Sequence, residues 1–220
     1  RDGTEQNMSF AGGKKQGELE EVGKVGKANT GTTIRFWPDP QYFDSSNISA
    51  SKLQHALKAK AVLCPGLEVK LKIESTGEKI AWVYTGGLEQ YLKETIGHTQ
   101  HIPEIPFSGG FKSDNEAVDW ALVWLQEEGG NLSESYVNLV PTAQGGTHVN
   151  GLRTGLANAI REFCDFRSLL PRGVTLTPED VWDNVNYVLS VKLEDPQFSG
   201  QTKERLSSRE SAAFVTGVIK

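Results

Sequence analysis

Alternating hydrophobicity in the second half of the chain constrains the fold more than any other feature. Bulky apolar side chains occupy every second position over residues 118–124 and again over residues 185–193. A period of two predicts β-strands. For the first of these segments a helix capped by residues 113–116 remains an alternative, because these four polar residues suit a helix start. A further strand is expected over residues 136–140.

Helical periodicity separates and follows these strands. A long helix is expected from Thr147, because six apolar side chains lie within about 120° of one another on a helical wheel: Leu152, Leu156, Ala159, Ile160, Phe163 and Phe166. Residues 177–180 predict a short helix with proline in its first turn. Residues 207–210 fit a capping box for a last helix reaching Ile219. The order strand–strand–helix–strand–helix predicts an α+β domain.

The first half of the chain predicts a second α+β domain. Strands are expected within residues 1–37, including the β-branched and aromatic segment 32–37. A helix over residues 49–63, a hairpin of residues 69–73 and 80–84, and a helix over residues 87–95 follow. Residues 98–112 hold two prolines and no clear pattern. We therefore expect the domain boundary near residue 100, giving domains 1–100 and 101–220.

Composition narrows the classes of protein to which the chain can belong. Residues 101–220 carry 10 basic and 16 acidic side chains, which argues against a standalone DNA-binding domain, since such domains are normally basic. No apolar run is long enough to span a membrane, and the first residues lack the apolar stretch typical of a signal peptide. The two cysteines, Cys64 and Cys164, are expected to be buried thiols of a cytosolic protein, with no zinc-site spacing. Both ends of the chain resemble cuts within a longer protein.

Four segments, in order, resemble the B subunits of bacterial type II topoisomerases. Residues 195–206 contain Gln201-Thr202-Lys203 and resemble the family's QTK loop. Residues 29–39 resemble the strand that closes its ATPase domain, and residues 58–66 resemble a helix linking strand layers there. Residues 144–153 resemble the start of the first helix of its transducer domain. The resemblance extends over essentially the whole chain.

This resemblance implies a fold and a function. Residues 1–100 would be the C-terminal part of a GHKL (Bergerat) ATPase domain, and residues 101–220 a transducer resembling domain 2 of ribosomal protein S5. In the family, ATP closes a dimer of B subunits, which drives a DNA duplex through a break made by the A subunits. Residues 62–66 and 170–174 favour topoisomerase IV, a cytoplasmic heterotetramer with two A subunits. The alternatives are a gyrase B fragment and a MutL-like mismatch-repair switch, which joins the same two folds.

The resemblance also assigns residues to a site. Lys203 and Gln201 match the positions that reach the γ-phosphate of ATP, where an ammonium and an amide can stabilise moving negative charge. Thr32 matches a position at the adenine end of the pocket. Arg153 is either a contact to DNA phosphate or a structural ion-pair partner. The family's Mg2+ ligands and general base lie upstream of residue 1, so the piece alone is expected to hold no cofactor or metal and to lack ATPase activity.

Three further expectations concern the same regions. The loop 198–205 is expected to be mobile, because it has no apolar side chain between Phe198 and Leu206. Residues 145–147 are expected to be a helix N-cap and not a phosphate cradle, since they lack the GxxxxGK[ST] pattern. The histidines show no partner spacing and receive no role.

Overall fold

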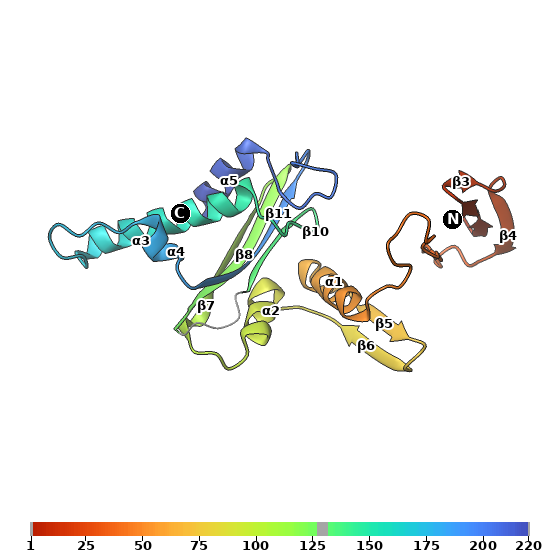
Figure 1. The fold of residues 1–220 in the computed structure, drawn as a ribbon, viewed down its shortest axis with the longest axis horizontal. Helices are drawn as coiled ribbons and strands as arrows, with labels where there is room; N and C mark the ends of the chain where they lie inside the picture. Colours follow the sequence, from red (N-terminus) through yellow and green to blue (C-terminus); the bar gives the residue numbers. More distant parts are fainter. Residues whose placement is uncertain (1, 127–131, 220) are drawn as a thin grey trace. The chain divides into compact units, whose positions relative to one another are not determined.

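The structure is a computed structural model that describes residues 2–126 and 132–219. Its contacts divide the chain into two units, Arg1–Leu53 and Gln54–Lys220 (Figure 1). No such division falls near residue 100, because the helix before that point packs on the strands after it. The boundary expected there therefore remains a proposal about domains.

The first unit contains only short strand pairs. Strand β1 (Thr4–Asn7) pairs with β4 (Glu20–Lys24), and β2 (Phe10–Ala11) pairs with β3 (Lys14–Lys15), both antiparallel. The expected strand over residues 32–37 is wrong for this structure. Ile34, Phe36 and Trp37 are 65–79% exposed and lie in no strand. A β-forming composition needs a neighbouring strand to pair with, and the described residues of this unit supply none.

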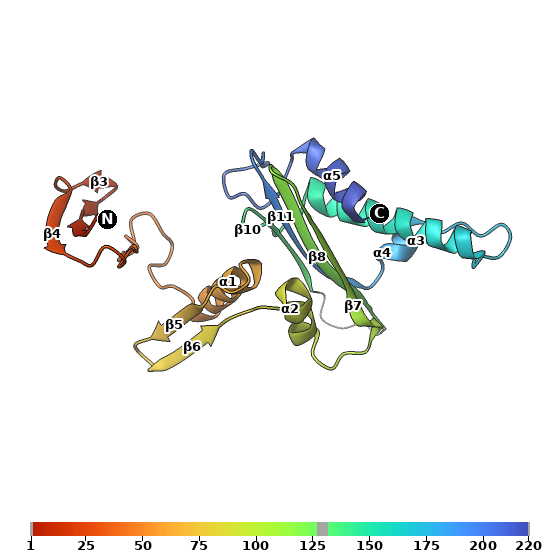
Figure 2. The same cartoon turned by 180° about the vertical axis from the view of Figure 1, so that it is seen from behind.

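A five-stranded sheet forms the centre of the second unit, in the order β10-β9-β11-β8-β7 (Figures 1 and 2). The strands are β7 (His101–Lys112), β8 (Glu116–Leu125), β9 (Ser133–Val137), β10 (Val140–Pro141) and β11 (Val185–Leu193). Strand β11 pairs antiparallel with β8 and parallel with β9. Every residue of β11 from Val185 to Val191 is buried, so helices must cover both faces of the sheet.

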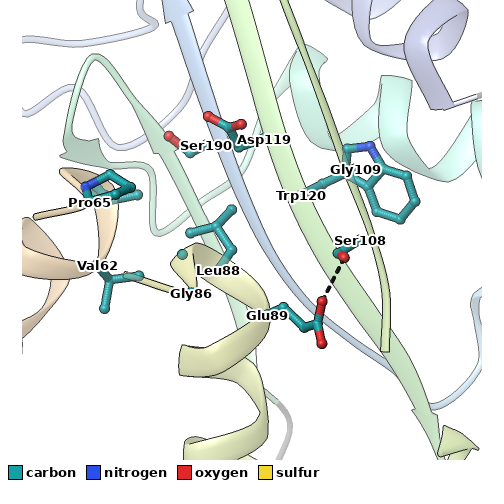
Figure 3. A pocket seen from close by; sticks show the side chains of 12 residues that line it. Val62, Pro65, Gly86, Leu88, Glu89, Ser108, Gly109, Asp119, Trp120 and Ser190 are labelled. Atoms are coloured by element: carbon teal, nitrogen blue, oxygen red, sulfur yellow. Dashed lines mark hydrogen bonds between the residues drawn. The ribbon is translucent and has the colours of Figure 1, made fainter. Parts of the chain in front are cut away.

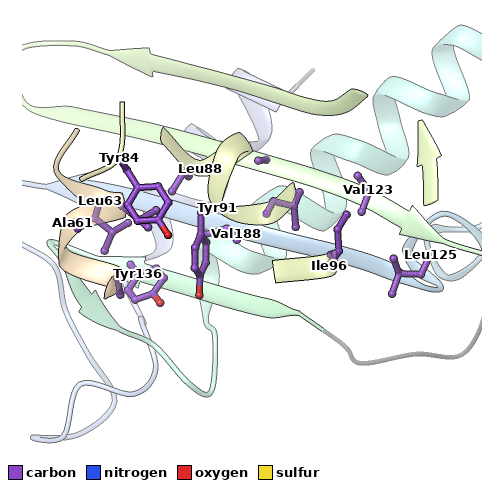
Figure 4. Close-up of a cluster of buried hydrophobic side chains, with 14 residues drawn as sticks. Ala61, Leu63, Tyr84, Leu88, Tyr91, Ile96, Val123, Leu125, Tyr136 and Val188 are labelled. Atoms are coloured by element: carbon purple, nitrogen blue, oxygen red, sulfur yellow. The ribbon is translucent and has the colours of Figure 1, made fainter. Parts of the chain in front are cut away.

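The two faces carry separate cores because successive strand residues point to opposite sides. On one face, Val123 and Val188 pack with α1 (Ala50–Leu63) and α2 (Gly87–Ile96), as Figure 4 shows. On the other, Leu122 and Leu189 pack with α3 (Thr147–Arg167), α4 (Pro178–Trp182) and α5 (Arg209–Ile219). The hairpin of β5 (Val69–Ile73) and β6 (Glu78–Trp82) follows α1.

Most of the elements expected in this unit are confirmed. They are the helices α1, α2, α3, α4 and α5, the hairpin β5–β6, and the strands β8 and β11. The alternative of a helix capped by residues 113–116 is wrong. The Ser113 hydroxyl instead donates to the carbonyl of Glu116, 3.1 Å away, within the turn joining β7 and β8.

Two expectations about strands in this unit need correction. Residues 101–112 form the edge strand β7, whose register shifts between Ile102 and Phe107, where both prolines lie. An edge strand tolerates proline, because its outer N–H groups need no partner. Residues 136–140 form two strands and not one, since Asn138 and Leu139 have φ of 48° and 67° and turn the chain.

The apolar stripe of the long helix is buried over only part of its length. Leu152 and Leu156 are buried, but Phe163 and Phe166 are 56% and 85% exposed. Helix α3 has 21 residues, whereas its partner α5 has 11, so the end of α3 has no helix to cover it.

Candidate functional site

The loop that contains Gln201 and Lys203 is closed at its base. Phe198 and Leu206 form an antiparallel bridge, and the amide of Ser199 donates to the carbonyl of Arg205 at 3.0 Å. Leu206 is 1% exposed, whereas residues 199–205 are exposed. The loop therefore stands on a buried stem, which the sequence did not indicate. Its expected mobility remains a prediction.

Lys203 lies at the tight part of this loop. Its φ is 59°, in the left-handed region, and its amide donates to the carbonyl of Gly200 at 3.1 Å. The ammonium lies 5.8 Å from the centre of the Phe198 ring. No carboxylate pairs with it among residues 2–126 and 132–219. An exposed cation without an ion-pair partner is available to an anion from outside the loop.

The stem of the loop is bonded to the start of α3. Leu206 donates its amide to the carbonyl of Gly145 at 3.0 Å, and its own carbonyl accepts from the amide of Thr147 at 3.1 Å. Beside it, the amide of Gln144 donates to the carbonyl of Glu204 at 2.9 Å, and the Gln144 side chain donates to the Glu204 carboxylate at 2.8 Å. Gly146 is the N-cap residue of α3, as expected. The loop thus supplies an acceptor to the first turn of that helix.

A buried polar group lies directly behind this junction. His148 is fully buried, and its Nε2 lies 3.0 Å from the hydroxyl of Thr142, which donates to the carbonyl of Ser135 at 2.9 Å. Burial lowers the pKa of His148 from 6.5 to about 4. The imidazole is therefore neutral at physiological pH. Histidine spacing gave no signal for this residue, because its partner is a threonine six residues upstream and not another histidine, cysteine or carboxylate.

Arg153 and Thr32 take no part in this junction. Arg153, on α3, donates to the carboxylate of Glu179 at 2.7 Å, in a partly exposed ion pair between α3 and α4. Thr32 belongs to the other unit and is exposed in a segment without strand pairing. Of the three residues proposed within the second unit, the structure thus places Gln201 and Lys203 in one loop and Arg153 in a separate contact.

A cavity of about 260 Å³ lies elsewhere in the second unit (Figure 3). The end of α1, the start of α2 and strands β7, β8 and β11 line it. Glu89 in its wall accepts from Lys93 at 2.7 Å and from Ser108 at 3.0 Å. These two bonds, that of Lys93 first, lower the pKa of Glu89. None of the residues proposed from the sequence lines this cavity.

The described residues contain neither a metal-binding cluster nor a membrane-spanning helix. Residues 2–126 and 132–219 contain no cluster of three or more His, Cys, Asp or Glu side chains suited to a metal ion. Within the same residues, no helix has the length and apolarity needed to cross a bilayer.

The mixed α/β fold and the sequence are similar to those of topoisomerase IV and gyrase B subunits. A family model described as DNA gyrase B matches residues 87–220. The chain belongs to this family. The B subunit of DNA topoisomerase 4 from Pseudomonas aeruginosa is 60% identical over 220 residues, and that from Escherichia coli is 59% identical. The chain spans 35% of the length of each of these relatives.

Solved structures of related proteins are similar to this chain over its whole length. The topoisomerase IV ATP-binding domain of Francisella tularensis, in complex with a small-molecule inhibitor, matches with a TM-score of 0.85 and 39% identity. The 43K ATPase domain of Thermus thermophilus gyrase B, in complex with an aminocoumarin, matches with a TM-score of 0.77 and 26% identity. All of this chain and 59% of each of those chains align. The higher identities favour topoisomerase IV over gyrase, and family membership decides against the MutL-like alternative.

Proposed function

We propose that this chain is the part of a topoisomerase IV B subunit that couples ATP binding and hydrolysis to DNA strand passage. Residues 1–100 are the end of a GHKL ATPase domain, and residues 101–220 are an S5-like transducer. The whole protein works in the cytoplasm as a heterotetramer with two A subunits and uses ATP with Mg2+. The support for ATP is that two solved relatives are described as ATP-binding or ATPase domains.

One observation carries this proposal: an exposed lysine, with no ion pair among the described residues, lies on a loop whose stem is bonded to α3. Lys203 supplies the charge, and the stem residue Leu206 supplies the bonds to α3. Contact between Lys203 and the γ-phosphate would thereby be transmitted to α3. The ammonium and the Gln201 amide are cationic and hydrogen-bond-donating groups, which suit a phosphate.

The chemistry of Lys203 is electrostatic. At 3–4 Å from a phosphoryl oxygen, an ammonium contributes about 4 kcal/mol at an effective dielectric near 20. Charge moves during phosphoryl transfer, so this stabilisation acts mainly on the transition state. ATP brings the transferable phosphoryl group, and the Mg2+ ligands come from outside the described residues of this chain.

Two further assignments concern Thr32 and Arg153. Thr32 is proposed at the adenine end of the pocket. The neighbouring Ile34, Phe36 and Trp37 are exposed, as expected of a surface that the rest of an ATPase domain would cover. Arg153 is proposed to meet DNA phosphate, and its partial exposure beside α4 leaves its guanidinium accessible from solvent.

The test is Lys203→Ala in the full-length B subunit assembled with its A subunit. We expect kcat for ATP to fall on the order of 100-fold with a smaller change in nucleotide affinity, because most binding contacts lie outside this loop. Decatenation of interlinked DNA circles should fall with it. Lys203→Arg should restore little activity, since a planar guanidinium needs more room. Lys79→Ala, an exposed lysine on β6, is the matched control.

Three outcomes would count against parts of this proposal. Near-normal turnover in Lys203→Ala would remove the role of the loop. ATP-driven introduction of negative supercoils by the wild-type assembly would favour a gyrase. Micromolar ATP binding to this chain alone, measured by calorimetry, would contradict the placement of the main nucleotide contacts outside it.

A further inference from the structure

We propose that Gly146 is a positioning residue for Lys203: its missing side chain lets the stem of the Gln201–Lys203 loop lie directly on the start of α3. This inference rests on the proposed role of Lys203 in ATP hydrolysis. It goes beyond that role by naming the contact that fixes where the loop stands.

The contact between Gly146 and Leu206 leaves no room for a side chain. A Cβ built on Gly146 would lie 2.6 Å from the backbone nitrogen of Leu206 and 2.9 Å from its carbonyl carbon, and nearer still to its carbonyl oxygen. These are backbone atoms, so no side-chain rotation relieves the clash. The φ of Gly146 is 136°, which side chains other than hydrogen rarely permit.

Hydrogen bonds on both sides of this contact fix the position of the stem against the start of α3. Residues 144, 145 and 147 each bond to Glu204 or Leu206, and Gly146 forms a parallel bridge with Leu206. The buried side chain of Leu206 prevents the stem from shifting into the core. A Cβ at position 146 must therefore push the stem outward or break its bonds to α3.

The start of α3 is held independently of the loop. The hydroxyl of Thr147 lies 2.7 Å from that of Ser211 on α5, and Ser211 also donates to the carbonyl of Ser208 at 2.7 Å. The Gly151 and Gly155 contacts hold α3 against α5 further along. Substitution at Gly146 should thus displace the loop more than the helix. A displacement of about 1 Å at a catalytic group can lower a rate about 100-fold.

Gly217 on α5 offers a matched control outside the loop. A Cβ there meets no atom within 4 Å, and its φ is not positive. Gly217→Ala therefore adds the same methyl group without touching the loop or its stem. A second variant, Gln144→Ala, removes the side-chain bond to the Glu204 carboxylate from an exposed position, where folding is not at risk.

The experiment measures ATP turnover and the affinity for a non-hydrolysable ATP analogue in the full-length B subunit with its A subunit. For Gly146→Ala we expect kcat to fall about 10- to 100-fold, with analogue affinity within about threefold of wild type. Gln144→Ala should lower kcat about two- to tenfold, and Gly217→Ala should leave it unchanged. ATP-dependent decatenation should fall in parallel.

A double mutant separates positioning from general damage. If Gly146 acts through Lys203, adding Gly146→Ala to Lys203→Ala should lower kcat no further, within about twofold. Full additivity, or normal kcat in a folded Gly146→Ala, would overturn the inference. Should Gly146→Ala fail to fold, Gln144→Ala alone and combined with Lys203→Ala decides by the same criteria. Normal turnover of Lys203→Ala would instead refute the proposed function, so the two failures are distinguishable.

Discussion

The hydroxyl of Tyr91 on α2 donates to the carboxylate of Glu134 on β9, with distances of 3.0 and 3.1 Å to its two oxygens. The hydroxyl of Tyr136 donates to the same carboxylate at 2.7 Å. Burial, and secondarily the charge of Glu134, raises the pKa of both tyrosines. Both hydroxyls therefore remain protonated donors, and Glu134 joins α2 to the sheet from a position only 17% exposed.

Tyr91→Phe should destabilise the chain by about 1.5–3 kcal/mol, the range for a hydrogen bond to a charged group. The remaining phenyl ring keeps the packing, so the loss comes from the hydroxyl. Urea unfolding at pH 7 measures it. Tyr42→Phe is the control, because that side chain is 66% exposed. Equal stabilities of wild type and Tyr91→Phe would show that the bond to Glu134 is not made in solution.

His148 should make stability depend on pH. Its folded pKa of about 4 lies below the unfolded value of 6.5, so the unfolded chain binds a proton first as pH falls. The stability present above pH 6.5 is lost progressively down to about pH 4, about 3 kcal/mol in all at 1.36 kcal/mol per pH unit. Unfolding free energies at pH 7.5 and pH 4.5 should differ more in wild type than in His148→Gln. His98→Gln, exposed, should behave as wild type.

Two glycines in paired helices should respond to alanine with opposite signs. A Cβ at Gly155 on α3 would lie 2.8 Å from Cβ of Ile219 and 3.0 Å from the carbonyl oxygen of Thr216, so Gly155→Ala should destabilise by about 1–3 kcal/mol. At Gly217 on α5 a Cβ meets nothing within 4 Å, so Gly217→Ala should stabilise by about 0.5–1 kcal/mol through helix propensity. Thermal unfolding distinguishes the two. Destabilisation by Gly217→Ala would indicate a contact that the described residues lack.

Variants of Arg153 and Glu179 can show whether Arg153 contacts DNA or only forms a structural ion pair. The pair is exposed enough that breaking it should cost at most about 1 kcal/mol. If Arg153 meets DNA, Arg153→Ala should weaken DNA binding by the full-length enzyme and reduce the slope of log affinity against log salt by about one. Glu179→Gln, which frees the guanidinium, should not weaken binding. Identical effects of both variants would leave Arg153 a structural residue.

The sequence predicted elements wherever local periodicity and capping agreed with the final packing. Thr177 and Asp180 form the reciprocal capping box of α4, which needs only neighbouring residues. The strands β8 and β11 followed from period-two patterning, because each lies in a sheet with different helices on its two faces. The strand expected over residues 32–37 does not form, because a strand needs a partner strand and composition does not provide one.

What the sequence by itself determined is the family, through four ordered segments, and the order of most helices and strands, since both depend on short-range pattern. The tertiary structure alone decided which distant groups meet. The two prolines of β7 hid its strand pattern in the sequence. The strand nevertheless forms, because it lies at the edge of the sheet, where proline is tolerated. Leu206 reaches Gly146 across 60 residues of chain, and the hydroxyl of Tyr91 reaches Glu134 across 43 residues. Such contacts depend on how the chain packs in three dimensions. The backbone of Leu206 can approach residue 146 only because glycine has no side chain there, and the local sequence pattern does not predict this approach.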